Sequence, residues 1–284
     1  MSTSESPLVV GDVFGTYRVR AHNIASDSEN KIHDDTVARR YGFSGGLVPG
    51  IAVFGYLTRP VAERWDVDWL ERGTASARFL QPCYEGEEVT VRALSLPSRS
   101  AGTAEVGLSV ARPDGTKCAE GVASFPRTAA PAPDLRNYPP APLPAERPPA
   151  SATSLAAGTI LGTLSLRLDE ARATAFADSI SDDLSVYRGP RGIAHPALLL
   201  ALANRVLAGN VVLGPWIHVS SDVNHFSLAR YGDAISLRAR VAECFERKGH
   251  EFVVLDIVVV AEPGRPVQQI RHTAIYRPRP HGPS

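Results

Sequence analysis

The same succession of sequence features occurs twice in this chain, and this duplication restricts what the chain can fold into. Residues 86–93 (GEEVTVRA) and residues 232–239 (GDAISLRA) match at an offset of 146 residues. The same offset aligns Pro49-Gly50 with His195-Pro196, and an apolar run follows each pair. One helix start and one strand start therefore keep their separation in both halves, which indicates two copies of one structural unit.

A proline-rich segment separates the two copies. Residues 128–150 contain eight prolines, and this density excludes a helix or an inner strand. We expect this segment to be an extended linker. The N-terminal unit then occupies residues 1–127, and the C-terminal unit occupies residues 151–284.

Each unit is predicted to be a long helix followed by an antiparallel meander. Alternation of apolar and polar residues marks the strands, and turn signals containing Pro and Gly separate two of them in each unit. Strands are expected at residues 13–19, 88–94, 103–111 and 117–125 of the first unit and at residues 164–168, 234–242, 251–261 and 267–276 of the second. The architecture is therefore α+β, repeated twice.

The charge and cysteine content exclude several classes of partner. The 284 residues include 30 Lys and Arg against 30 Asp and Glu, so the broad basic surface that nucleic-acid binding needs is missing. The longest apolar runs, residues 47–57 and 193–202, are about half of the ~20 residues that span a bilayer, and the N-terminus lacks a secretory signal. Three scattered cysteines form no metal-binding pattern. We expect a cytoplasmic protein with no metal, no cofactor, no nucleic-acid partner and no membrane partner.

Two segments ahead of the first helix carry the chemically informative residues. Residues 23–35 read NIASDSENKIHDD, and residues 41–50 read YGFSGGLVPG. Together they resemble the hydratase motif of the MaoC-like, R-specific enoyl-CoA hydratase family. Its pattern is roughly Gly-Asp-x-Asn-Pro-Ile/Leu-His-x-Asp, followed by a turn of small residues before a hydrophobic helix. The resemblance implies the hotdog fold in both halves, hence an α+β double hotdog, with the motif in the first half alone.

Four residues match the family pattern: Asn30, Ile32, His33 and Asp35. The resemblance implies that His33 is a catalytic imidazole and that Asn30 belongs to the same site. Simpler roles are also consistent with the sequence, because His33 can cap a nearby carbonyl and Asn30 can cap a turn.

The sequence departs from the pattern in three ways, one of which removes the catalytic carboxylate. The position of the family's catalytic Asp, five residues before the histidine, is Ser28; the motif proline is Lys31; and the loop before the helix is one residue shorter. A serine hydroxyl is a poor base near pH 7. Either Asp27 reaches the site through a local bulge, or His33 acts without a carboxylate.

The chemistry that the resemblance implies requires proton transfer and charge stabilisation. Adding water to a 2-enoyl thioester needs a base and an acid, and backbone N–H groups at a helix N-terminus can stabilise charge on the thioester oxygen. Gly50 and Ile51 are the expected donors. At the start of the second helix, His195 is a candidate substrate-binding residue or a helix cap, but no motif precedes it, so the second half is expected to be non-catalytic.

These observations predict an acyl-thioester hydratase or dehydratase that uses neither metal nor redox cofactor. The alternatives are a hotdog thioesterase and a non-catalytic protein that binds acyl thioesters. The expected partner is an acyl thioester of CoA or of an acyl carrier protein. Two fused units would pair their sheets into a compact pseudo-dimer, which can further associate into a homodimer.

Overall fold

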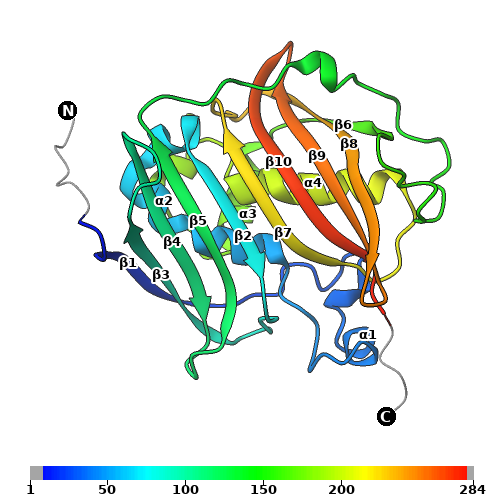
Figure 1. The fold of residues 1–284 in the computed structure, drawn as a ribbon, viewed down its shortest axis with the longest axis horizontal. Helices are drawn as coiled ribbons and strands as arrows, with labels where there is room; N and C mark the ends of the chain where they lie inside the picture. The colour runs from blue at the N-terminus through cyan, green and yellow to red at the C-terminus, as the bar shows by residue number, and fades with distance from the viewer. Residues whose placement is uncertain (1–8, 280–284) are drawn as a thin grey trace.

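One antiparallel sheet of ten strands dominates the computed structural model, which describes residues 9–279 (Figure 1). The strands of the first half are β1 (Val13–Arg20), β2 (Thr74–Phe79), β3 (Glu88–Leu96), β4 (Thr103–Ala111) and β5 (Lys117–Pro126). Those of the second half are β6 (Ile160–Arg167), β7 (Ile217–His225), β8 (Ala234–Arg247), β9 (His250–Ala261) and β10 (Arg265–Arg277). Their order across the sheet is β1-β3-β4-β5-β2-β7-β10-β9-β8-β6.

This order is symmetric about the β2/β7 pair. Each half contributes five strands in the corresponding sequence, and the two halves join through antiparallel pairing of Thr74 with Asn224 through Arg78 with Ser220. One hydrophobic core extends through both halves. The duplication inferred from the sequence is thereby confirmed as a double hotdog that forms an internal pseudo-dimer.

Two long helices lie against one face of the sheet, behind it in the view of Figure 1. Helix α2 (Gly50–Arg72) packs on the strands of the first half, and α4 (Pro196–Asn210) packs on β6, β8 and β10. Both are apolar along most of their length, as expected for helices that pack between a sheet and another helix. Within residues 9–279, no helix is both long and apolar enough to cross a bilayer.

The remaining helices are short. They are α1 (Asp35–Arg40), α3 (Glu170–Ser179) and the 3-10 turns η1 (Lys31–His33), η2 (Leu135–Asn137) and η3 (Ser185–Tyr187). Asp34 caps α1 by accepting from the Val37 N–H at 2.9 Å, a common arrangement at helix N-termini. Helices η1 and α1 hold the motif segment next to the start of α2.

The proline-rich segment packs on the outer face of the second half. Tyr138 is buried against Val258 and Val260 of β9, and its hydroxyl donates to Asp256 at 2.8 Å. Apart from η2, residues 128–150 contain no helix. This packing fixes the path of the chain between the two halves.

The structure adds elements that the sequence patterns did not predict. The central strands β2 and β7 and helix α3 are all missing from the expected set. Strand β2 is short and turns only the small residues Ala75 and Ala77 toward the core, and β7 carries polar residues on its buried face. Neither therefore shows the alternation of large apolar residues that marks a strand.

Candidate active site

A cavity of about 230 Å³ lies where the motif of the first half meets β7 of the second half. Its walls are mostly apolar. Its titratable lining groups are His33, His218, Cys83 and Cys118, and no carboxylate is among the described residues that line it. No group of three or more metal-ligating side chains occurs within residues 9–279.

His33 is held in one tautomer by the backbone. Its Nδ1 lies 2.6 Å from the carbonyl oxygen of Leu47, which can only accept, so Nδ1 carries the proton and Nε2 carries the lone pair. Burial lowers the pKa of His33 below its usual value, and the hydrogen bond to the Leu47 carbonyl opposes this only in part. Near pH 7 the imidazole is therefore neutral and able to accept a proton at Nε2.

Asn30 joins the motif to the second half of the chain. Its Nδ2 donates to the carbonyl oxygen of Trp216 at 2.9 Å, and its Oδ1 accepts from the Trp216 N–H at 3.1 Å. Its Oδ1 also caps η1 through the Ile32 N–H at 3.3 Å, and its Nδ2 lies 3.4 Å from His33 Nε2. Asn30 therefore caps a turn and also lines the cavity, so the two roles considered from the sequence occur together.

Gly46 permits the close approach between the motif and the turn before α2. A Cβ atom at this position would lie 2.1 Å from the carbonyl oxygen of His33, so a larger residue would push the two segments apart. The Gly46 N–H donates to Asp35 at 2.7 Å, and the Val48 N–H donates to the carbonyl oxygen of Cys83 at 2.9 Å. These contacts explain the roles of Gly46 and Asp35 in the motif.

The N-terminus of α2 opens into the cavity. Pro49, its N-cap, makes no side-chain cap, and the first N–H groups of a helix have no acceptor within the helix. Gly50 lines the cavity. A Cβ atom there would lie 2.9 Å from both His218 Nδ1 and Phe79 Cε2, so glycine leaves the backbone accessible. The side chain of Ile51 is buried in the core outside this lining.

Ser28, at the position of the missing carboxylate, and its neighbour Asp27 both lie outside the cavity lining. Asp27 is exposed and is not among the lining residues. Ser28 is half-buried, and its hydroxyl donates to the carbonyl oxygen of Asn30 at 3.2 Å. In this geometry the loop shortened by one residue does not bring the Asp27 carboxylate to His33.

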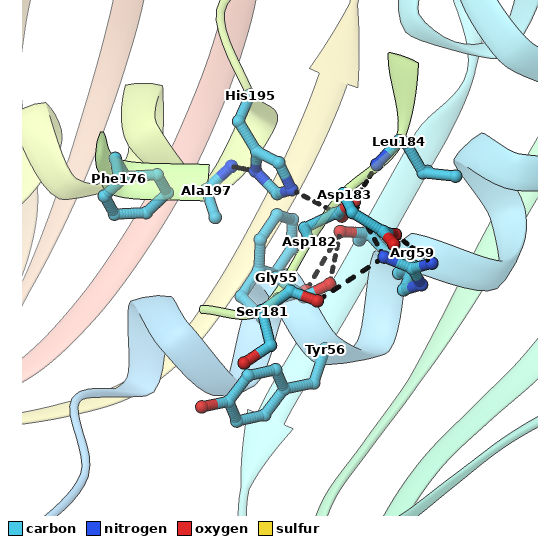
Figure 2. Close-up of polar contacts among 12 residues, drawn as sticks. Gly55, Tyr56, Arg59, Phe176, Ser181, Asp182, Asp183, Leu184, His195 and Ala197 are labelled. Carbon is cyan, nitrogen blue, oxygen red and sulfur yellow. Dashed lines mark hydrogen bonds and ion pairs between the residues drawn. The ribbon is translucent and has the colours of Figure 1, made fainter. Parts of the chain in front are cut away.

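His195 begins the equivalent helix in the second half, where both of its ring nitrogens are occupied (Figure 2). Nδ1 accepts from the Ala197 N–H at 3.0 Å, and Nε2 lies 3.2 Å from Asp182. Asp182 also pairs with Arg59 of α2 at 3.0 Å. His195 is buried and does not line the cavity, so the geometry gives it the role of a helix cap.

The pseudo-symmetric position in the second half is closed. The hollow near the start of α4 has a volume of only about 10 Å³, too small for a ligand. Buried apolar residues such as Leu70, Leu199 and Leu228 line what remains of this hollow. Only the first half therefore keeps an open helix N-terminus beside a cavity, within the residues that the structure describes.

His218 and Trp216 complete the cavity, although the sequence did not single them out. Both belong to the segment around β7, which carries no recognisable motif. The one available signal was the unusual placement of two histidines, His218 and His225, in a nine-residue strand.

Solved structures share this architecture, whereas no family model and no curated protein sequence matches the chain. A proposed MaoC-domain dehydratase from Chloroflexus aurantiacus superposes with a TM-score of 0.67 at 13% identity, covering 98% of this chain and 100% of that one. A conserved hypothetical protein of Mycobacterium tuberculosis, described as having a double hotdog fold, has a TM-score of 0.67 at 16% identity, covering 94% and 96%. A proposed oleoyl thioesterase from Lactobacillus plantarum has a TM-score of 0.54 at 11% identity, covering 95% and 97%. These likenesses confirm the double hotdog fold and the structural resemblance to MaoC-like dehydratases.

Proposed function

We propose that this chain is an acyl-thioester hydratase or dehydratase, which adds water to a 2-enoyl thioester or removes it from a 3-hydroxyacyl thioester. The observation that carries the proposal is the position of His33. Its unprotonated Nε2 lies in a mostly apolar cavity, close to the uncapped N-terminus of α2. A base and a set of oxyanion donors are the two parts that this reaction needs.

The chemistry follows from these two parts. His33 Nε2 takes a proton from water while the water oxygen bonds to C3, and the π electrons move toward C2 and the thioester oxygen. The N–H groups of Gly50 and Ile51, at the positive end of the helix dipole, stabilise the charge on that oxygen. The imidazolium then returns its proton to C2, so no further acid is required.

The remaining cavity groups suit a pantetheine thioester. Asn204 of α4 lines the cavity, and its buried Oδ1 has no hydrogen-bond partner. An amide N–H of a pantetheine arm would satisfy this acceptor. Phe43, Phe79 and Ile275 supply an apolar surface for the acyl chain, and the modest cavity volume fits a short chain best.

Hydrolysis of the thioester is the second candidate. A base and oxyanion donors also suffice for attack of water on the carbonyl carbon. No carboxylate is among the described residues that line the cavity, so the acid/base pair that the hydratase motif normally supplies is incomplete. This observation supports hydrolysis as the second candidate.

One assay separates these reactions. The purified chain is incubated with crotonyl-CoA, and loss of the conjugated enoyl absorbance is followed in parallel with release of free thiol. Loss of absorbance without thiol is expected, and His33→Ala should abolish it. Release of thiol would show hydrolysis in place of the proposed hydration. If neither signal appeared, only a binding role would remain.

A further inference from the structure

His218 lines the cavity and carries an unsatisfied buried nitrogen. The side chain is 8% exposed, and its Nδ1 is buried without a hydrogen-bond partner. This atom would lie 2.9 Å from a Cβ atom on Gly50, which places it beside the open N-terminus of α2. Leaving a buried polar atom unpaired is destabilising, and a ligand that paired with it would recover that free energy.

A β-bulge directs His218 inward. The register of β7 against β10 shifts between Thr273, which pairs with Ser220, and Ala274, which pairs with His218. As a result His218 and Ser221, three residues apart, are both buried on one face of the strand. Bulges of this kind re-aim side chains and are frequent next to active sites.

Behind His218 lies a short chain of buried hydrogen bonds. His218 Nε2 is 2.8 Å from Ser221 Oγ, which is 3.1 Å from His272 Nδ1. The serine has a single proton to donate. Of the two orientations of that proton, donation to His218 Nε2 makes the hydroxyl accept from His272 Nδ1–H and places the proton of His218 on Nδ1, beside Gly50.

His218 and His272, the two histidines of this hydrogen-bonded chain, are both neutral near pH 7. Burial holds the pKa of His218 well below its usual value, the neighbouring His272 ring lowers it further, and an interaction with the Ser220 backbone opposes this only in part. Burial lowers the pKa of His272 to about 4. A neutral imidazole can still polarise a carbonyl group by hydrogen bonding, and depression of its pKa keeps it in that form.

We infer that His218 contacts the substrate, donating a hydrogen bond from Nδ1–H to the carbonyl oxygen of the acyl thioester beside the Gly50 N–H. This inference rests on the proposed acyl-thioester site and adds an oxyanion donor from the opposite half of the chain. Ser221 and His272 are positioning residues, because they select the tautomer of His218 without reaching the ligand.

Substitutions at His218 test the donor. His218→Asn keeps an amide N–H near the place of Nδ1, whereas His218→Leu removes it. We expect His218→Leu to lower kcat/KM for crotonyl-CoA about 10²–10³-fold, as loss of an oxyanion donor does, and His218→Asn to stay within about tenfold of wild type. His225→Gln is the matched control, since His225 is a buried histidine of the same strand that does not line this cavity. Equal activity of His218→Leu and wild type would overturn the inference.

A second readout does not depend on turnover. Histidine nitrogen NMR with butyryl-CoA, a saturated thioester that cannot be hydrated, should show His218 Nδ1 protonated and shifted in the complex. Ser221→Ala should alter this tautomer, whereas Ser220→Ala, on the other face of the strand, should not. An unprotonated Nδ1, or an Nδ1 chemical shift that does not change when the protein is saturated with butyryl-CoA, would overturn the inference. A shift in a chain that neither hydrates nor hydrolyses crotonyl-CoA would support the contact while refuting the proposed reaction.

Discussion

Single hydrogen bonds decide the chemical state of the residues in this site. The carbonyl oxygen of Leu47 fixes the proton of His33 on Nδ1, and the hydrogen bonds of Asn30 to Trp216 fix the position of the opposite wall. The matches of His33 and Asn30 to a known motif made both residues predictable. The environment that tunes His33 was not predictable, because it depends on burial by residues from the other half.

The pH dependence of turnover should report His33. Because its pKa in the folded protein is lowered, the basic form persists below the usual histidine pKa of about 6.5. We therefore expect kcat/KM to be constant near pH 7 and to fall on acidification with a midpoint below 6.5. The midpoint is measured from a pH profile of kcat/KM for crotonyl-CoA hydration. A midpoint above 6.5 would contradict the role of His33 as a buried neutral base.

The exposure of Asp27 favours catalysis without a carboxylate. Asp27→Asn should accordingly change the hydration rate by less than about twofold, as surface substitutions usually have small effects. Because Ser28 also lies outside the cavity lining, Ser28→Asp should likewise leave the rate within about twofold of wild type. Ser26→Asp is the control for added charge, since Ser26 is exposed on the same loop. Loss of turnover in Asp27→Asn would show instead that Asp27 reaches the site during catalysis.

At the level of elements, the two long helices differ at their N-termini. Helix α2 begins with an uncapped Pro49-Gly50 turn at the cavity, and α4 begins with a buried histidine cap. The sequence offset aligned these positions but did not reveal that one is open and the other closed. That difference arises from tertiary contacts of His195 with Asp182 and of Asp182 with Arg59.

Gly50→Ala tests whether the start of α2 is a binding surface. The added Cβ would lie 2.9 Å from His218 Nδ1 and from the Phe79 ring, so it should block the approach of a thioester to the backbone. We expect at least a tenfold loss of kcat/KM, about 1.4 kcal/mol, with little change in the urea midpoint. Gly214→Ala is the control, because a Cβ there meets nothing within 4 Å.

His195→Ala should affect stability rather than catalysis. The change removes the cap on the Ala197 N–H and one partner of buried Asp182, and loss of an N-cap alone costs about 0.5–2 kcal/mol. Urea unfolding should show a lower free energy of unfolding, with kcat/KM nearly unchanged. A raised KM at unchanged stability would instead make His195 a substrate-binding residue.

For the whole molecule, the strands away from the junction of the two halves were predictable from the sequence, whereas the strands at the junction were not. The outer strands followed from alternation in the sequence, with bounds close to those observed except that β6 begins four residues earlier and β8 ends five residues later. The central strands β2 and β7 were missed because Ala75, Ala77 and the polar buried residues of β7 give little apolar signal. His218 was therefore missed with the strand that carries it.

Cleavage of the linker should leave the two halves associated. They share the β2/β7 pairing and one hydrophobic core, and burial of apolar surface is the main force that holds such interfaces together. A specific protease site inserted after the exposed Ala130 allows the test by gel filtration. The cut protein should elute at the volume of the intact 30.4 kDa chain. Halves that separate and stay folded would contradict this expectation.

Covalent fusion also changes how such a protein can evolve. In a symmetric dimer of identical hotdog subunits, any substitution appears in both sites at once. Here the two halves are different segments of one chain, so His195 caps α4 beside a nearly closed hollow while Gly50 keeps the start of α2 open to the cavity. Each half can thus acquire mutations that the other does not share, and a change at position 218 alters the wall of one site alone.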